Sequence, residues 1–341
     1  MSGGAPIGPS LEPWLAKMRG LSVGVVGDVI ADVYLHTRPS RLSREAPVIV
    51  VRWEREEVIP GGAANTARNL AAFGVRVQMV AEVGADRAGD SVIEMLGAAG
   101  VDPAAILRRP EQPTVTKTRI LAGDPHRTKQ QLFRIDREPR RGEARPREQE
   151  TIARLERIDA TVQAFLVSDY DYDLLTPAVV EWLRRKAQSK PVIVDSRHRL
   201  PSFAGVTVIT PNEEEAEETA GLKIEAGSDA VAVGRALLET LQVGAVLLTR
   251  GKHGMLLFEQ GQPPRDFPIV GTGEVVDVSG AGDTVVAAFT AARLAGAPLP
   301  DAAWISNCAA SVVVMKVGAA TCSLAELAAV LARSPAPAVR P

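Results

Sequence analysis

The chain has 341 residues, enough for one large α/β domain or for two domains of about 150 residues each. Hydrophobic residues make up 46% of the chain and charged residues 23%, a balance that excludes a largely disordered protein. The 39 Lys and Arg against 41 Asp and Glu give a net charge of −2, which offers no general attraction to a polyanion such as nucleic acid.

Cysteine content and hydropathy indicate a cytoplasmic protein. Its two cysteines, Cys308 and Cys322, are too few for a disulfide framework, and the sequence has no Cys and His pattern typical of zinc sites. The first twenty residues lack a continuous apolar segment, and no run of eighteen residues is free of charged or strongly polar side chains. We therefore expect a protein that binds neither membranes nor nucleic acid.

Apolar runs rich in Val, Ile and Leu alternate with helical patterns, which is typical of βαβ units around a mostly parallel sheet. Strands are predicted over 21–27, 75–83, 163–168, 191–194, 206–209 and 245–249. Helices are predicted over 63–73, 88–98, 177–188, 213–220, 230–241, 283–294 and 302–315. Because the strands are near-continuous apolar runs, we expect helices to cover both faces of the sheet.

Two segments interrupt this alternation and predict a small second β-layer that projects from the main sheet. Residues 48–53 form an apolar run between stretches rich in Arg and Glu, and residues 114–121 and 130–135 predict a hairpin around a Gly-Asp-Pro turn. Residues 138–150 contain too few apolar side chains to pack, and they predict an exposed linker that leads into a helix. Residues 331–341 predict a disordered tail.

The segment with the most chemical information is 275–286, where a short strand leads through a glycine turn into an apolar helix. Its glycines leave the backbone N–H groups of residues 280–283 free to converge at the helix N-terminus, where partial positive charge favours a phosphoryl group. Asp283 opens this helix, so its carboxylate would lie beside the phosphate and accept the proton of an attacking hydroxyl. The alternative, an ordinary turn with an acidic first helical residue, is the commoner meaning of a bare Gly-x-Gly-Asp.

Two further segments predict a polyhydroxylated ligand. Gly61 and Gly62 precede a predicted helix, and Asn65 in its first turn can both donate and accept hydrogen bonds with sugar hydroxyls. Asp28 and Asp32 follow the first predicted strand, at the edge where open α/β sheets bind ligands. Taken separately, each segment is explained equally well by a helix entry with a buried Asn or by turn capping.

Together and in this order, the three segments resemble the ribokinase-like (PfkB) family of carbohydrate kinases over residues 21 to about 325. Residues 277–283 resemble the family motif Asp-Thr-x-Gly-Ala-Gly-Asp, with Val278 in place of the Thr. The resemblance implies a three-layer α/β/α fold with a mostly parallel central sheet and a small projecting β-sheet lid. It implies ATP-dependent transfer of a phosphoryl group to a sugar hydroxyl.

The resemblance also implies the domain boundaries and the residues that act on the sugar. A single kinase domain would span residues 18–330, with lid segments at about 33–60 and 112–137. The implied catalytic base is Asp283, and the implied anion hole consists of Gly280, Ala281 and Gly282. The implied sugar ligands are Asp28, Asp32, Gly61, Gly62 and Asn65.

Other stretches resemble the nucleotide and cation sites of the family. In its Asn-x-x-Glu motif, matched by residues 212–215, Asn212 approaches the triphosphate and Glu215 organises hydrated Mg²⁺. Without the resemblance, residues 213–218 predict only a solvated acidic helix start. The other implied nucleotide ligands are Thr249, Gly251, Gly254 and, on the adenine side, Asn307. Some members bind K⁺ beside the anion hole, where Asp277 is a candidate ligand.

Within the family, the chain most resembles the kinases that phosphorylate D-glycero-β-D-manno-heptose 7-phosphate at O1 to give the 1,7-bisphosphate. The stretches that carry this resemblance are 27–34, 40–48, 113–117, 130–136 and 168–170. They imply that Arg41, Arg134 and Asp169 contact the substrate, and a guanidinium group suits the phosphate already present on such a sugar. In many bacteria this kinase is fused to a nucleotidyltransferase, for which 341 residues leave no room, so we expect another protein to supply that activity.

The chain departs from that subfamily at two places. The residues after Ser-Asp-Tyr are 171–173, Asp-Tyr-Asp, where a small residue and Lys-Gly are usual, and Asp195-Ser196-Arg197 replaces Asp-Pro-Lys. Arg197 or Arg199 would have to compensate for the two missing lysines. Two alternatives therefore stay open: a kinase of an unphosphorylated sugar or nucleoside, and a sugar-binding regulator without turnover. Because lids of relatives often pair between subunits, the resemblance also implies a homodimer.

Overall fold

The computed structural model describes residues 11–123, 129–139, 147–225, 227–271 and 275–334. Its main body contains a nine-stranded sheet that is parallel except for the antiparallel strands β14 and β15 at one edge. In spatial order the strands are β15 (Arg265–Phe267), β14 (Met255–Glu259), β13 (Ala245–Thr249), β12 (Val208–Ile209), β11 (Val192–Ser196), β10 (Ala164–Asp169), β1 (Ser22–Gly27), β4 (Arg76–Val80) and β6 (Val101–Asp102).

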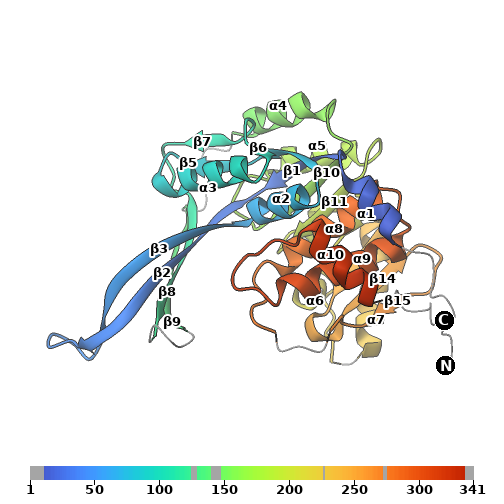
Figure 1. Ribbon diagram of the computed structural model, residues 1–341. Helices are drawn as coiled ribbons and strands as arrows, with labels where there is room; N and C mark the ends of the chain where they lie inside the picture. Colours follow the sequence, from blue (N-terminus) through green and yellow to red (C-terminus); the bar gives the residue numbers. More distant parts are fainter. Residues whose placement is uncertain (1–10, 124–128, 140–146, 226, 272–274, 335–341) are drawn as a thin grey trace, which may run out of the picture.

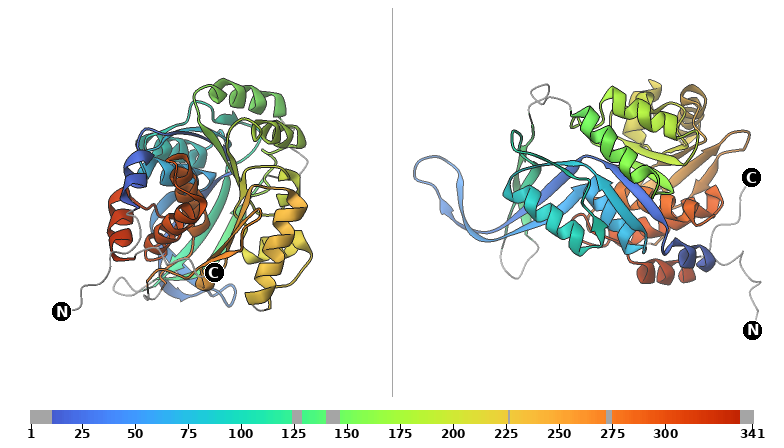
Figure 2. Two further views of the ribbon diagram at one scale, coloured as in Figure 1. Left: turned by 90° about the vertical axis from the view of Figure 1, so that its right-hand side faces the viewer. Right: turned by 90° about the horizontal axis from the view of Figure 1, so that it is seen from above.

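Helices cover both faces of this sheet and make three layers (Figures 1 and 2). One face packs against α1 (Glu12–Met18), α2 (Ala63–Ala72), α3 (Arg87–Ala98), α8 (Ala281–Leu294), α9 (Leu299–Val313) and α10 (Leu324–Arg333). The other packs against α4 (Glu148–Asp159), α5 (Pro177–Lys186), α6 (Glu213–Ala220) and α7 (Gly227–Leu241). Strands β1 and β10 are buried at every position, which explains their lack of alternation. The predicted three-layer α/β fold is confirmed.

A four-stranded sheet, here called the projecting sheet, extends away from the main body (Figure 1). Its strands in order are β3 (Ile49–Gly62), β2 (Val29–Leu42), β8 (Val115–Ala122) and β9 (Gln130–Arg137). The predicted hairpin is present as β8 and β9, and its Gly-Asp-Pro turn reaches into 124–128, outside the described residues. The strand predicted over 48–53 is too short, because β3 pairs with β2 along most of its fourteen residues.

Other boundaries differ from those predicted. The strand predicted over 75–83 is two strands, β4 and β5 (Glu82–Gly84), and β5 pairs with β7 (Leu107–Arg109). Helix α1 begins before residue 18 and α10 continues beyond residue 330, so regular structure is wider than the predicted domain. The predicted linker and tail lie partly outside the described residues, at 140–146 and 335–341. Among the helices of the described ranges, none is long and apolar enough to cross a membrane.

Strands β1 and β10 approach each other most closely at Gly27. Gly27 is paired with Ser168, and a Cβ atom added at Gly27 would lie 2.0 Å from the carbonyl oxygen of Ser168. The contact is between backbones, so neither strand can yield by a side-chain rotation. Asp28 and Asp169 directly follow the paired residues, and the close approach therefore sets the spacing of two acidic groups at this edge of the sheet.

We predict that Gly27→Ala lowers the free energy of unfolding by about 1–3 kcal/mol, because the two strands must separate to admit the methyl group. Gly97→Ala is the matched control, since Gly97 lies in α3 and its added Cβ would meet no atom within 4 Å. The control should gain about 0.5–1 kcal/mol from the lower backbone entropy of alanine. Urea unfolding measures both changes, and equal stabilities of the two variants would contradict the prediction.

Candidate active site

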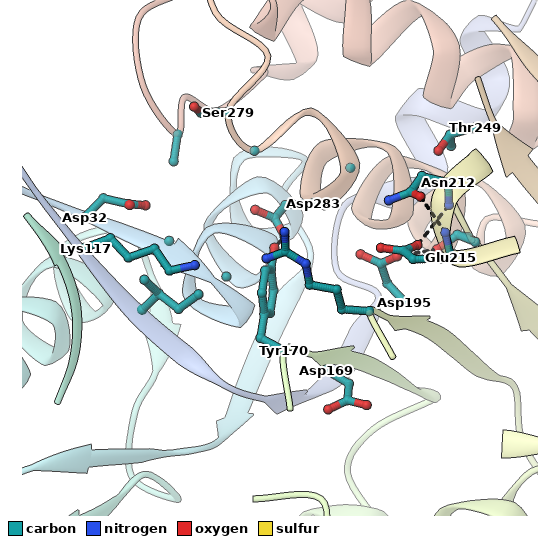
Figure 3. A pocket seen from close by; sticks show the side chains of 18 of the residues that line it. Asp32, Lys117, Asp169, Tyr170, Asp195, Asn212, Glu215, Thr249, Ser279 and Asp283 are labelled. Carbon is teal, nitrogen blue, oxygen red and sulfur yellow. Dashed lines mark hydrogen bonds between the residues drawn. The ribbon is translucent and has the colours of Figure 1, made fainter. Parts of the chain in front are cut away.

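A cavity of about 400 Å³ lies where the projecting sheet meets the carboxyl ends of the parallel strands and the start of α8 (Figure 3). Ligands of open α/β sheets bind at this edge. Of the residues expected from the sequence to form the site, those that line the cavity are Asp32, Gly61, Gly62, Arg134, Asp169, Asn212, Glu215, Thr249, Gly280, Gly282 and Asp283. The cavity therefore brings together residues from the three main segments of the sequence interpretation, at 28–32, 61–65 and 277–283.

Asp283 occupies the centre of this arrangement. Figure 3 shows it between Asp32 and Lys117 on one side and the group of Asn212, Glu215 and Thr249 on the other. The side chain is only 3% exposed and lies in the first turn of α8. Burial raises the pKa of Asp283 from 3.8 to about 6, and hydrogen bonds from neighbouring side chains limit the rise. The carboxylate is thus ionised at neutral pH but is a stronger base than an exposed Asp.

Three side chains hold the Asp283 carboxylate. Asn65 Nδ2 donates to Oδ2 at 3.0 Å, while Thr66 Oγ1 and Tyr170 Oη donate to Oδ1, each at 3.1 Å. Asn65, which the sequence implied as a sugar ligand, is completely buried and contacts the expected base directly. The sequence analysis did not predict Thr66 and Tyr170 as site residues, because their partner Asp283 is distant in sequence.

The turn before α8 is built around Gly280. Gly280 has a φ of 75°, and a Cβ there would lie 2.5 Å from Asn65 Nδ2, so both backbone and space require glycine. The N–H of Ala281 donates to the carbonyl of Val278, whereas Gly282 and Asp283 lie in the first helical turn, where backbone N–H groups have no partner within the helix. These N–H groups can bind a phosphoryl oxygen.

On one side of the cavity, the projecting sheet contributes a paired carboxylate. Asp32 Oδ1 accepts a hydrogen bond from Arg119 Nη1 at 2.5 Å, and a Cβ at Gly61 would lie 2.2 Å from Asp32 Oδ2. Burial works against the charge of Arg119, but the bond to Asp32 outweighs it and raises the pKa of Arg119. Gly61 thus leaves room for a carboxylate that Arg119 orients.

Two of the expected sugar ligands have other partners. Asp28 is 4% exposed and lines a separate, smaller cavity, where its Oδ2 accepts the N–H groups of Tyr170 at 2.8 Å and Tyr172 at 3.2 Å. Burial and then the charge of the nearby Asp169 raise the pKa of Asp28 to about 7. Asp169 lines the main cavity, but its carboxylate is occupied by Arg199 and by the hydroxyl of Ser196.

The opposite side of the cavity is acidic. Asn212 and Glu215 form a capping box at the start of α6, in which each side chain accepts the backbone N–H of the other residue at 2.9 Å. Burial raises the pKa of Glu215 to about 7. The pKa of Asp195 is also raised, first by burial and then by the charge of Glu215. A partly buried carboxylate pair of this kind is suited to a hydrated divalent cation.

The remaining expected residues lie outside the cavity lining. Gly251 begins the short turn η2 (Gly251–His253) between β13 and β14, and Gly254 follows it. Asn307 in α9 donates to the carbonyl of Pro268 at 2.7 Å. Asp277 accepts the N–H groups of Ser279 and Gly318, each at 2.8 Å; despite burial, these bonds lower its pKa. Arg41 is exposed near the far end of β2.

Several residues of the lining were missed by the sequence analysis, among them Lys117, Arg119, Tyr170, Asp195 and Ser279. Lys117 and Arg119 are two positions apart on β8, and alternate residues of a strand point to the same face. That spacing was a usable signal, but it identifies a site only when β8 is known to pair in parallel with β2, so that Lys117 lies opposite Asp32.

The family described as pfkB family carbohydrate kinase matches residues 21–326. The chain is 42% identical over 305 residues to the bifunctional protein HldE of Pseudomonas aeruginosa (strain LESB58), covering 89% of this chain and 62% of that protein. It is 37% identical over 321 residues to HldE of Geobacter sulfurreducens, covering 93% and 64%. The chain therefore spans less than two thirds of the length of these curated relatives.

Solved structures with low sequence identity share the fold. The structure of Arabidopsis thaliana ribokinase complexed with ribose and ATP has a TM-score of 0.73 at 22% identity, covering 92% of this chain and 99% of that one. Phosphofructokinase-2 from Escherichia coli in complex with substrates and products has a TM-score of 0.73 at 15% identity, with the same coverage. The predicted ribokinase-like fold is confirmed by these similarities.

Proposed function

Because the chain belongs to the pfkB family of carbohydrate kinases, we propose that it transfers the γ-phosphoryl group of ATP to a hydroxyl of a sugar phosphate. The observation that carries this proposal is the meeting, in one cavity, of the Asp283 carboxylate and the first-turn N–H groups of α8. The acceptor that we propose is D-glycero-β-D-manno-heptose 7-phosphate, phosphorylated at O1. The subfamily resemblance of the sequence and the cations of the cavity support this choice.

In the proposed reaction, Asp283 takes the proton of the attacking hydroxyl while the N–H groups of Gly282 and Asp283 stabilise the charge on the transferred group. Asp32 accepts hydrogen bonds from the sugar hydroxyls and so orients the acceptor. Positioning of the two substrates supplies most of the rate enhancement. The effective molarities of well-oriented groups lower the activation barrier by roughly 7–11 kcal/mol, whereas a general base accelerates the reaction by about 10²–10⁴-fold.

The acidic side of the cavity is the proposed nucleotide and metal side. Asn212 and Thr249 line it, and Asp195 and Glu215 fit hydrated Mg²⁺ because a divalent cation would offset the cost of burying two neighbouring carboxylates. When bound, such an ion neutralises charge on the phosphates of ATP. Asp277 remains the proposed ligand for a monovalent cation such as K⁺. Its carboxylate accepts the N–H of Ser279, directly before Gly280, and the N–H of Gly318.

Positively charged side chains in the cavity support the proposal that the acceptor sugar already carries a phosphate. Lys117, Arg134 and Arg197 line the cavity, and the pKa of Lys117 is lowered first by burial and then by the charge of Arg197. Neighbouring positive groups in one cavity are stabilised by a bound anion. Arg197 stands where the subfamily has a lysine, and we propose that it replaces that lysine. Arg199 is not a candidate, since it does not line the cavity and is bound to Asp169.

We predict that Asp283→Asn lowers kcat by about 10²–10⁴-fold and leaves the KM for the sugar nearly unchanged. The base acts when ionised, so kcat/KM of the unaltered enzyme should fall as the pH drops below about 6. Asp301→Asn is the matched control, because Asp301 occupies the corresponding third position of α9. Steady-state ADP release measures these parameters, and a normal kcat for Asp283→Asn would remove Asp283 from the role of base.

A second prediction concerns the acceptor. Lys117→Met and Arg197→Met should each raise the KM for heptose 7-phosphate by about 10- to 100-fold, because each removes a charge-assisted hydrogen bond worth roughly 1.5–3 kcal/mol. The KM for the unphosphorylated heptose should change little, and Arg41→Met, on the exposed part of β2, should alter neither value. Equal effects on both sugars would favour the alternative, a kinase of unphosphorylated acceptors.

We propose that the protein forms a homodimer through the projecting sheet, which then acts as a lid over the bound sugar. Apolar side chains on this sheet are more than half exposed: Leu42, Val48, Ile49, Trp53, Phe133 and Ile135. An exposed apolar surface of this kind indicates an interface. Light scattering at micromolar concentrations should give a dimeric mass for the unaltered protein and a monomeric mass for Trp53→Lys. A monomeric mass for the unaltered protein would overturn the proposal.

A further inference from the structure

The two oxygens of the Asp283 carboxylate are not equivalent. Oδ1 accepts two hydroxyl donors, from Thr66 and Tyr170, whereas Oδ2 accepts the amide of Asn65. Each carboxylate oxygen has two lone pairs that can accept hydrogen bonds. The two hydroxyl groups therefore fill Oδ1, and one position remains on Oδ2. A proton taken from a ligand would go to that position.

Among these donors, Tyr170 lies in a segment whose backbone is itself held by hydrogen bonds to buried carboxylates. Its backbone N–H donates to Asp28 Oδ2, and the N–H of Tyr172 donates to the same oxygen. Asp28 lies at the junction of β1 and β2, and its own N–H donates to the carbonyl of Ser168 at 3.1 Å. One buried carboxylate thus ties the segment after β10 to the strands on which the sugar side of the cavity is built.

A second carboxylate fixes the other side of this segment. The N–H of Asp171 donates to Asp169 Oδ1 at 3.1 Å, and the Asp169 carboxylate is held by Arg199. Asp171 and Asp173 have φ values of 64° and 69°, in the left-handed region that residues other than glycine rarely adopt. Such strain persists only where surrounding contacts determine the conformation, and for Asp171 the bond to Asp169 is one such contact.

We propose that Tyr170 is a positioning residue, whose hydroxyl occupies Oδ1 of Asp283 and thereby directs Oδ2 toward the hydroxyl of the acceptor. This inference rests on the proposed function, in which Asp283 is the base. Burial and the charge of Asp283 raise the pKa of Tyr170 well above its usual value, so its hydroxyl stays protonated and remains a donor. The donated bond also favours the ionised form of Asp283.

Other charged groups near Asp283 also influence its titration. Asp32 of β2 raises the pKa of Asp283, and Asp195 of β11 interacts with it electrostatically. Lys117 of β8, Arg134 of β9 and Arg197 after β11 line the same cavity. A substitution that removes only the Tyr170 hydroxyl leaves all of these charges in place, so a shift in the titration of Asp283 reports the lost hydrogen bond.

The test compares Tyr170→Phe with Tyr172→Phe. Tyr172 lies two residues along the same segment, but its hydroxyl donates to Glu138 Oε1 at 2.6 Å. For Tyr170→Phe we expect kcat to fall about 10- to 100-fold with little change in KM. We also expect the acid limb of kcat to move up by about one pH unit, since the lost bond to a charged group corresponds to about that shift. Tyr172→Phe should match the unaltered enzyme.

A readout that does not depend on turnover separates this inference from the proposed function. The pKa of Asp283 can be followed by NMR of ¹³C-labelled carboxyl groups, with the signal assigned by its loss in Asp283→Asn. It should rise by about one unit in Tyr170→Phe and stay unchanged in Tyr172→Phe. Thr66→Val, which removes the other donor to Oδ1, should raise it in the same direction.

The outcomes are distinguishable. An unchanged pKa and an unchanged kcat in Tyr170→Phe would overturn the positioning role even if the protein proves to be an active sugar kinase. An equal loss in Tyr172→Phe would also overturn it, because the effect would then come from the segment and not from the hydroxyl. A protein without sugar-stimulated ADP release would refute the proposed function, while the NMR titration would still decide whether Tyr170 controls Asp283.

Discussion

A carboxylate removed from water at the start of α8 is the constraint on which the rest of the site depends. Burying the charge of Asp283 is costly unless its oxygens are hydrogen-bonded, and the required donors come from two other parts of the chain. Asn65 and Thr66 are more than 200 positions away in sequence, and Tyr170 is 113 positions away. The hydrogen bonds to the Asp283 carboxylate therefore fix α2, α8 and the segment after β10 relative to one another.

Both acidic and basic side chains line the cavity around Asp283. Asp195 and Glu215 make one side acidic, while Lys117 and Arg197 supply positive charge to the same cavity. Asp32 is neutralised by Arg119, so its side of the cavity offers a carboxylate acceptor without a large net charge. In the proposed reaction this division orders the ligands, with metal and nucleotide at the acidic side and the phosphorylated end of the acceptor near the cations.

Local sequence signals predicted the fold and the centre of the site. Near-continuous apolar strands identified the covered parallel sheet, and the glycine turn before Asp283 predicted an anion hole at a helix N-terminus, because both depend on neighbouring residues alone. The turn and the helix are present, and the anion hole stays a prediction. The full length of β2 was not predicted, since its outer half is polar and exposed. Arg119 and Tyr170 were missed because their partners are distant in sequence. Asp28 was interpreted as a sugar ligand because the sequence does not show that it turns inward.

The central claim is that Asp283 and the first N–H groups of α8 act together on a phosphoryl group in transfer. The most direct measurement is a crystal structure with ADP, aluminium fluoride, Mg²⁺ and heptose 7-phosphate, because aluminium fluoride imitates the transferred group. The account predicts fluoride atoms within hydrogen-bonding distance of the N–H groups of Gly282 and Asp283, and the acceptor O1 against Asp283 Oδ2. Aluminium fluoride bound away from the start of α8, or an acceptor hydroxyl out of reach of Asp283, would contradict it.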